Sequence, residues 1–242
     1  MPTEPEDEEV PLSSAEKLLS RLQDDLERIK VTQGFQRNSE AFGFWAIQQI
    51  SPSLSERDTR YALEIGGPGD HGINAIWWDK DHRENGEQRG ALHLARVMCP
   101  DFLVSDSRFG PEAAQELHRG LTWLAQANEE KLRPEFRRAK EDFENRLHGG
   151  QRIILSVVVA GAASRGLKEE LGTISIELAS EFLAGDVTIE LFDLHRLDCL
   201  YIDRLELGDV RPPPIVNLRV RSRYLIRDYG SHRALVWCTS QT

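Results

Sequence analysis

The alternation of apolar and charged positions predicts two helices in the first fifty residues. Leucines recur every four residues from Leu18 to Leu26 with charged residues between them, which is the pattern of an amphipathic helix. Gly34 is expected to end this helix because glycine is a poor helix former. A second apolar segment, residues 39–50, predicts another helix, which Pro52 should end because proline cannot continue a helix.

The next part of the chain has the pattern of β-structure. Residues 73–78 and 91–98 are short, mostly apolar runs, and the segment 79–90 between them is polar and contains Asn-Gly. Two such runs around a turn sequence predict a β-hairpin with a long loop. Residues 61–65 are interpreted as a third possible strand.

Further along, helical and extended patterns alternate. Leu117, Leu121 and Leu124 predict one helix, and a second should begin near Pro134. The nearly uninterrupted apolar run 153–159 predicts a strand covered on both faces. The remaining predictions are helices at 169–182 and 193–201 and strands at 187–192, 215–220, 224–226 and 234–238.

This order of elements predicts an α/β protein with a mixed sheet flanked by helices. A chain of 242 residues can form one large domain or two small ones. We expect an acidic, disordered tail over 1–11, an α/β core over 12–210, and a β-rich segment over 211–242. Because Thr242 directly follows an apolar strand, we expect this segment to begin a second domain and the chain to be a fragment of a longer protein.

The segment from Gly66 to Ile76 carries the main chemical signal. Its Gly-Gly-Pro-Gly turn leads into a predicted strand, and the next strand ends Arg96-Val-Met98. Metal-dependent nucleases present an Asp, then a Glu or Gln, then a Lys on two adjacent strands of this kind. In this chain the three positions hold Asn74, Arg96 and Met98. We expect Asn74 and Met98 to lie on neighbouring antiparallel strands with their side chains on one face.

The residues at these three positions are unsuited to metal-dependent hydrolysis. Mg²⁺ prefers anionic oxygen ligands, which the amide of Asn74 does not supply. Met98 lacks the charge with which a lysine would stabilise the transition state. Arg96 adds positive charge where the metal would sit. Since Asn and Asp are nearly isosteric, we expect position 74 to tolerate a restored carboxylate.

The run Gly66-Gly-Pro-Gly-Asp-His-Gly-Ile-Asn-Ala-Ile76 followed by Arg96-Val-Met98 resembles the AIPR family of abortive-infection phage-resistance proteins. The family pattern is roughly Asp-Gly-x-x-Asp-x-Gly-Ile-Asp-x-Ile and then Gln-x-Lys. The resemblance implies a PD-(D/E)xK-type, restriction-endonuclease-like core and a role in phage defence. The substitutions at positions 74, 96 and 98 depart from the family and put catalysis in doubt.

Two carboxylates near these positions have two interpretations each. Glu40 matches the helix glutamate that often joins such sites, or it is an acidic residue favoured at a helix start. Asp70 lies in a tight turn, where aspartate commonly binds backbone amides. If the protein were an active Mg²⁺-dependent endonuclease, Glu40, Asp70 and Glu64 would have to hold the metal.

The net charge and the local charge of the chain point in opposite directions on nucleic-acid binding. The net charge of −10 argues against sequence-independent DNA binding, since phosphate contacts need lysine and arginine. Arg219, Arg221 and Arg223 nevertheless form a local basic stretch. They are candidate nucleic-acid contacts, or else the solvent side of a strand.

The sequence gives little support for a histidine metal site, a disulfide or a membrane span. His71, His82 and His93 have no metal-ligand spacing, so no metal site is expected. Cys99, Cys199 and Cys238 show no pairing pattern, which fits a reducing cytoplasm, and no apolar run is long enough to span a bilayer.

These observations give three hypotheses. The first is a phage-defence protein whose nuclease-like domain has lost catalysis and binds nucleic acid or a protein partner, with no cofactor. The second is an active endonuclease that uses Mg²⁺ and substituted residues. The third is a structural N-terminal domain of a larger protein. No membrane association is expected, and the oligomeric state is left open.

Overall fold

A computed structural model describes residues 14–66, 70–79, 90–104, 106–128, 132–149, 151–181, 186–207, 224–228 and 233–237. In these residues the chain is mixed α/β. The helices are α1 (Ser14–Gln33), α2 (Asn38–Ile50), α3 (Glu56–Ala62), α4 (Glu112–Gln126), α5 (Pro134–His148), α6 (Arg165–Glu181) and α7 (Leu194–Leu207). The strands are β1 (Ala75–Asp79), β2 (Ala91–Met98), β3 (Arg108–Phe109), β4 (Arg152–Val159), β5 (Ala162–Ala163), β6 (Asp186–Phe192), β7 (Tyr224–Asp228) and β8 (Arg233–Trp237).

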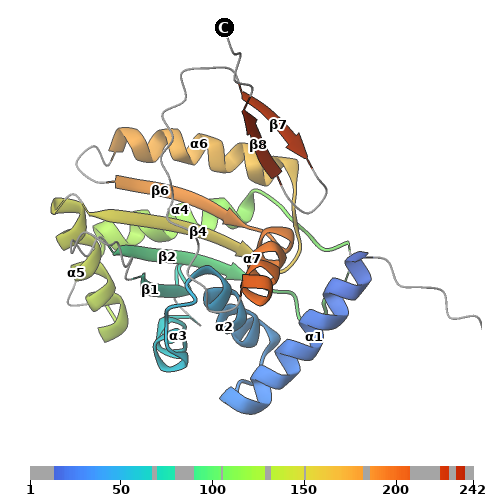
Figure 1. The fold of residues 1–242 in the computed structure, drawn as a ribbon. Helices are drawn as coiled ribbons and strands as arrows, with labels where there is room; N and C mark the ends of the chain where they lie inside the picture. Colours follow the sequence, from blue (N-terminus) through green and yellow to red (C-terminus); the bar gives the residue numbers. More distant parts are fainter. Residues whose placement is uncertain are drawn as a thin grey trace, which may run out of the picture. The chain divides into compact units, whose positions relative to one another are not determined.

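Four strands form the central sheet in the order β1-β2-β4-β6 (Figure 1). β1 pairs antiparallel with β2, whereas β2, β4 and β6 run parallel. The sheet is therefore mixed, as the sequence predicted. β1 and β6 are its two edge strands among the described residues.

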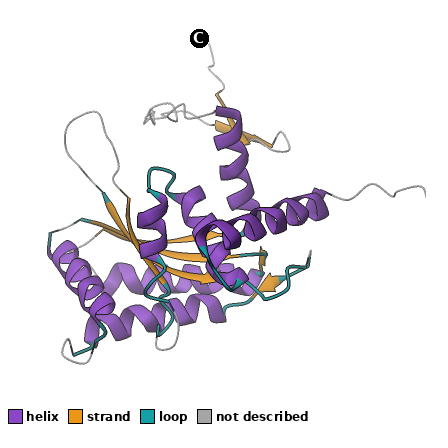
Figure 2. Cartoon of the chain, turned by 90° about the horizontal axis from the view of Figure 1, so that it is seen from below, coloured by secondary structure: helices purple, strands orange, loops and turns teal. Residues whose placement is uncertain are grey.

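Helices cover both faces of this sheet (Figure 2). On one face α4, α5 and α6 pack on alternate residues of the strands, including Leu94 of β2 and Leu155 of β4. The other face is covered by α2 and, beside β1, by α3. There the backbone of Gly43 in α2 lies close to Val97 of β2, and a Cβ at Gly43 would be 3.7 Å from the Val97 side chain.

The central strand β4 explains the apolar run in the sequence. Every residue from Ile153 to Val159 is buried. Both faces of β4 are covered by helices and both of its edges are paired, so neither face offers a position for a solvated side chain.

The chain divides into two compact units, residues 1–198 and 199–242. In the second unit β7 and β8 form an antiparallel pair, with Tyr224 opposite Trp237. The predicted boundary at 210 and 211, the acidic tail 1–11 and the predicted strand 215–220 lie outside the described residues. No described helix combines the length and apolar character needed to cross a membrane.

One sequence prediction about the core was wrong. Residues 61–65 are not a strand, because α3 extends through Ala62 and a turn follows it. The helix begins where the Ser55 side chain accepts a hydrogen bond from the backbone N–H of Asp58, at 3.1 Å. Such a cap satisfies one of the free N–H groups of a first turn and favours the helix.

Candidate functional site

The turn before β1 is fitted closely to helix α4. Gly72 has φ +101°, a conformation that favours glycine. A Cβ on Gly72 would lie 2.0 Å from the carbonyl oxygen of Glu116, and one on Gly120 would lie 2.7 Å from the carbonyl oxygen of His71. His71 itself has φ +51°, and its ring stacks on Trp123 with 3.8 Å between ring centroids. The glycines therefore allow the turn and α4 to touch backbone to backbone.

Asp70 organises this turn with one carboxylate oxygen. Its Oδ1 accepts a hydrogen bond from the Gly72 N–H at 3.0 Å, and its carbonyl accepts one from the Ile73 N–H at 2.9 Å. This is the turn-stabilising role that the sequence allowed for Asp70. Its second oxygen, Oδ2, is directed at Arg96 and lies 3.3 Å from Nη1.

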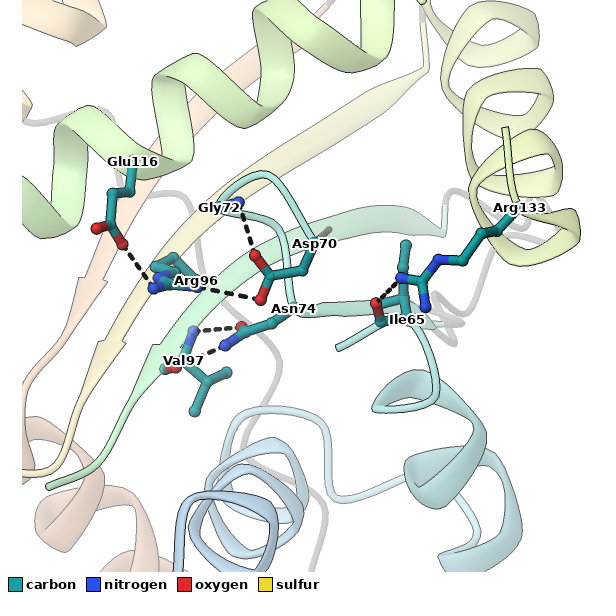
Figure 3. A network of polar contacts seen from close by, with 8 residues as sticks. All are labelled: Ile65, Asp70, Gly72, Asn74, Arg96, Val97, Glu116 and Arg133. Carbon is teal, nitrogen blue, oxygen red and sulfur yellow. Dashed lines mark hydrogen bonds and ion pairs between the residues drawn. The ribbon is translucent and has the colours of Figure 1, made fainter. Parts of the chain in front are cut away.

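Arg96 lies between two carboxylates (Figure 3). Its Nη2 forms an ion pair with Oε2 of Glu116 on α4 at 2.6 Å, while Nη1 contacts Asp70. The Arg96 side chain is 19% exposed, so much of the guanidinium is removed from water. A largely buried cation needs such anionic partners to offset its lost hydration.

Asn74 extends the strand pairing with its side chain. Its Nδ2 donates to the carbonyl of Val97 at 2.8 Å, and its Oδ1 accepts from the Val97 N–H at 2.7 Å (Figure 3). Its own backbone N–H donates to the carbonyl of Ala95. The carboxamide thus binds β2 as a further peptide unit of β1 would, using both a donor and an acceptor. This requires an amide and gives Asn74 a structural role.

The prediction for Asn74 and Met98 is therefore half right. The two residues do lie on adjoining segments of an antiparallel pair. The expected shared face is wrong, because the Asn74 carboxamide is directed at the main chain of β2. Met98 is half-buried and packs against the core.

We expect Asn74→Asp to lower the free energy of unfolding by about 1–3 kcal/mol, the cost of leaving the part-buried Val97 carbonyl without its donor. The substitution removes the N–H that binds the Val97 carbonyl and places a charged oxygen against it. This hydrogen bond argues against the expectation that position 74 tolerates Asp, since near-identical shape does not preserve the donor. Urea unfolding measures the difference.

Asn38→Asp is the matched control for this substitution. Asn38 also donates its Nδ2 to a carbonyl, that of Asp101 at 3.0 Å, but at an exposed contact. Water can replace that bond, so we expect a change of less than about 1 kcal/mol. Equal losses in the two variants would show that the contact with Val97 has no special importance.

The remaining predicted site residues do not join this cluster. Glu40 is exposed and caps α2, where its Oε2 accepts from the backbone N–H groups of Gln36 and Arg37 at 3.2 Å. Such a contact satisfies amides that a helix start leaves free. Arg219, Arg221 and Arg223 lie outside the described residues.

The residues around Arg96 do not fit a magnesium ion. Both polar atoms of the Asn74 side chain are engaged by Val97, and Met98 offers only a thioether. The two nearby carboxylates, Asp70 and Glu116, already share the guanidinium. Elsewhere in the described chain, no three His, Cys, Asp or Glu side chains are grouped as metal ligands.

Glu116 is the site residue that the sequence analysis missed. It lies on α4 between the buried residues Ala113 and Gly120, so it borders the helix face that packs on the sheet. A charged residue in that position of an amphipathic helix needs a partner. The pattern contains that signal, but it does not identify Arg96 as the partner.

Two side chains on or next to β2, His93 and Cys99, have shifted pKa values. His93 is 4% exposed and stacks on Trp77. Burial, reinforced by the charge of Arg152, lowers the pKa of His93 to about 4. Burial and nearby Asp101 raise the pKa of the Cys99 thiol to about 12, which makes it a poor nucleophile.

The chain was compared with protein-family models, with curated proteins and with solved structures, and no match was found in any of the three.

Proposed function

We propose that residues 1–198 form a nuclease-like core that does not carry out metal-dependent hydrolysis and that acts by binding nucleic acid or a protein partner. The observation that supports this is the Arg96 guanidinium held between Asp70 and Glu116. A cation of the protein itself neutralises the carboxylates that a metal would need. The proposal includes the restriction-endonuclease-like ancestry, the AIPR-type role in phage defence and a separate β-rich segment over 211–242.

Three features support the nuclease-like part of the proposal. The antiparallel β1–β2 pair brings the Asn74 segment beside Arg96. The parallel strand β4 follows on the other side of β2. Helix α4 then supplies an acidic residue, Glu116, to the same place. These features agree in arrangement with the family resemblance, and the residues at positions 74, 96 and 98 differ from it in chemistry.

The competing hypothesis, an active Mg²⁺ endonuclease, requires larger changes. Asp70 would have to release Arg96 as well as keep its bond to Gly72. Glu40 would have to leave the N-terminus of α2. We therefore expect the purified full chain to leave plasmid and linear DNA intact in Mg²⁺ or Mn²⁺. Cleavage that EDTA and Asp70→Ala both abolish would favour the active endonuclease over the binding proposal.

Two variants at Arg96 test the observation behind the proposal. Arg96→Gln removes the cation and leaves two carboxylates facing each other, so Mn²⁺ should raise the melting temperature of this variant. Arg96→Lys keeps a positive charge and should show no such response. A ligand at ten times its dissociation constant stabilises a protein by about 1.4 kcal/mol. An equal Mn²⁺ response in the wild-type protein and both variants would contradict the proposal.

A further inference from the structure

A cavity of about 440 Å³ lies beside β1, between α3 and α5. This volume falls within the range of ligand-binding cavities. The cavity is lined by residues other than Asp70, Arg96 and Glu116. The cavity is therefore separate from the Arg96 cluster that supports the nuclease-like core.

The cavity follows the outer edge of β1, which is open among the described residues. Ile76, Trp77 and Trp78 all line it. Successive side chains of a strand point to opposite faces, so Ile76 and Trp78 share one face, and the cavity borders the strand between them at Trp77. The opposite edge of β1 is paired with β2, and no other described strand pairs with it.

The lining combines apolar and acidic side chains. Tyr61 is 52% exposed, and Ile76 and Trp78 are half-buried. The charged residues of the lining are four carboxylates and one guanidinium, namely Asp58, Glu64, Glu135, Asp142 and Arg138.

These charges are unevenly compensated. Arg138 is turned toward Tyr61, to whose hydroxyl oxygen it donates at 2.6 Å. Asp142 interacts electrostatically with Arg146, whose guanidinium lies over the Trp78 ring. Within the described residues Glu64 and Glu135 form no ion pair. A cavity with excess negative charge attracts a positively charged ligand.

We propose that this cavity binds a short, extended peptide segment that carries lysine or arginine together with aliphatic side chains, and that the segment pairs with the open edge of β1. Backbone pairing at an exposed sheet edge is an established mode of peptide recognition. The carboxylates of Glu64 and of α5 bind the basic side chains, and the exposed part of Ile76 contacts the aliphatic ones. A small organic cation would use the charge but would leave the open edge unpaired.

The test measures binding of a fluorescein-labelled peptide, Lys-Val-Arg-Ile-Lys, to the full chain by fluorescence anisotropy. We expect saturable binding that weakens with salt, and no binding of the matched peptide Glu-Val-Glu-Ile-Glu. Methylation of alternate backbone nitrogens removes donors without changing charge. It should weaken binding about tenfold or more, which corresponds to the loss of one to two hydrogen bonds.

Neighbouring positions on α5 supply a matched pair of variants. Asp142 lines the cavity, whereas Glu141 is exposed and does not. We expect Asp142→Lys to weaken peptide binding about tenfold and Glu141→Lys to change it less than about twofold. Glu135→Lys gives an independent test on the same helix if Asp142→Lys does not fold.

Four results would overturn the proposal. They are the absence of binding to the wild-type protein, equal binding of the basic and acidic peptides, equal effects of the two lysine variants at 141 and 142, and undiminished binding of the methylated peptide. The last result would mean that only side-chain charge is recognised, as by a small-cation site.

Discussion

Gly72→Ala should lower the free energy of unfolding by roughly 3 kcal/mol or more, because it combines a backbone conformation unfavourable to alanine with a severe overlap. Gly72 has φ +101°, and the new Cβ would lie 2.0 Å from the carbonyl oxygen of Glu116. Relief requires the turn or α4 to move, which would also disturb the ion pair of Glu116 with Arg96. Urea unfolding followed by tryptophan fluorescence measures the loss.

Gly34→Ala separates the two contributions. Gly34 also has a positive φ, +72°, but no atom lies within 4 Å of a Cβ placed there. Only the conformational cost applies, so we expect a loss of about 1 kcal/mol. If both variants lose the same stability, the close contact of the turn with α4 does not limit position 72.

His93 should make folding stability depend on pH. The folded pKa is about 4 and the ordinary value is 6.5, because burial opposes the charged form and Arg152 adds to the effect. The unfolded chain therefore takes up a proton at a pH where the folded chain does not. The contribution of neutral His93 is complete above pH 6.5 and is lost as pH falls toward 4. The total loss is about 3 kcal/mol.

His93→Phe isolates this effect from the carboxylates that titrate in the same range. Phenylalanine keeps an aromatic ring against Trp77, whose ring centroid lies 4.6 Å from that of His93, and cannot be protonated. The difference in unfolding free energy between wild type and variant should shift by about 3 kcal/mol between pH 6.5 and pH 4. A difference that stays constant with pH would contradict the role assigned to His93.

The sequence predicted best those elements whose pattern is long and consistent. Helix α1 repeats its leucines over several turns and ends beside Gly34, and the apolar run of β4 matches a strand buried on both faces. Helix α3 was missed because it has only seven residues. Its start depends on a single cap at Ser55, which a periodicity argument does not detect.

The residues of the site could be predicted only in part, because some of their contacts join separate elements of the chain. The sequence placed Asp70, Asn74 and Arg96 near one another, since they belong to a turn and two adjacent strands. It could not show that the Asn74 amide binds the main chain of Val97, because that contact depends on how the two strands are aligned. Nor could it pair Arg96 with Glu116, which comes from a separate helix.

The contacts of Arg96 and Asn74 also bear on how such a site could change in evolution. Replacement of Arg96 alone would leave Asp70 and Glu116 without the cation they share. Replacement of Asn74 by Asp alone would set a charge against the Val97 carbonyl. Each step alone lowers stability, and a bound divalent cation could compensate only the first. A metal-binding site could therefore arise here more readily through position 96, where a divalent cation can replace the lost charge, than through position 74.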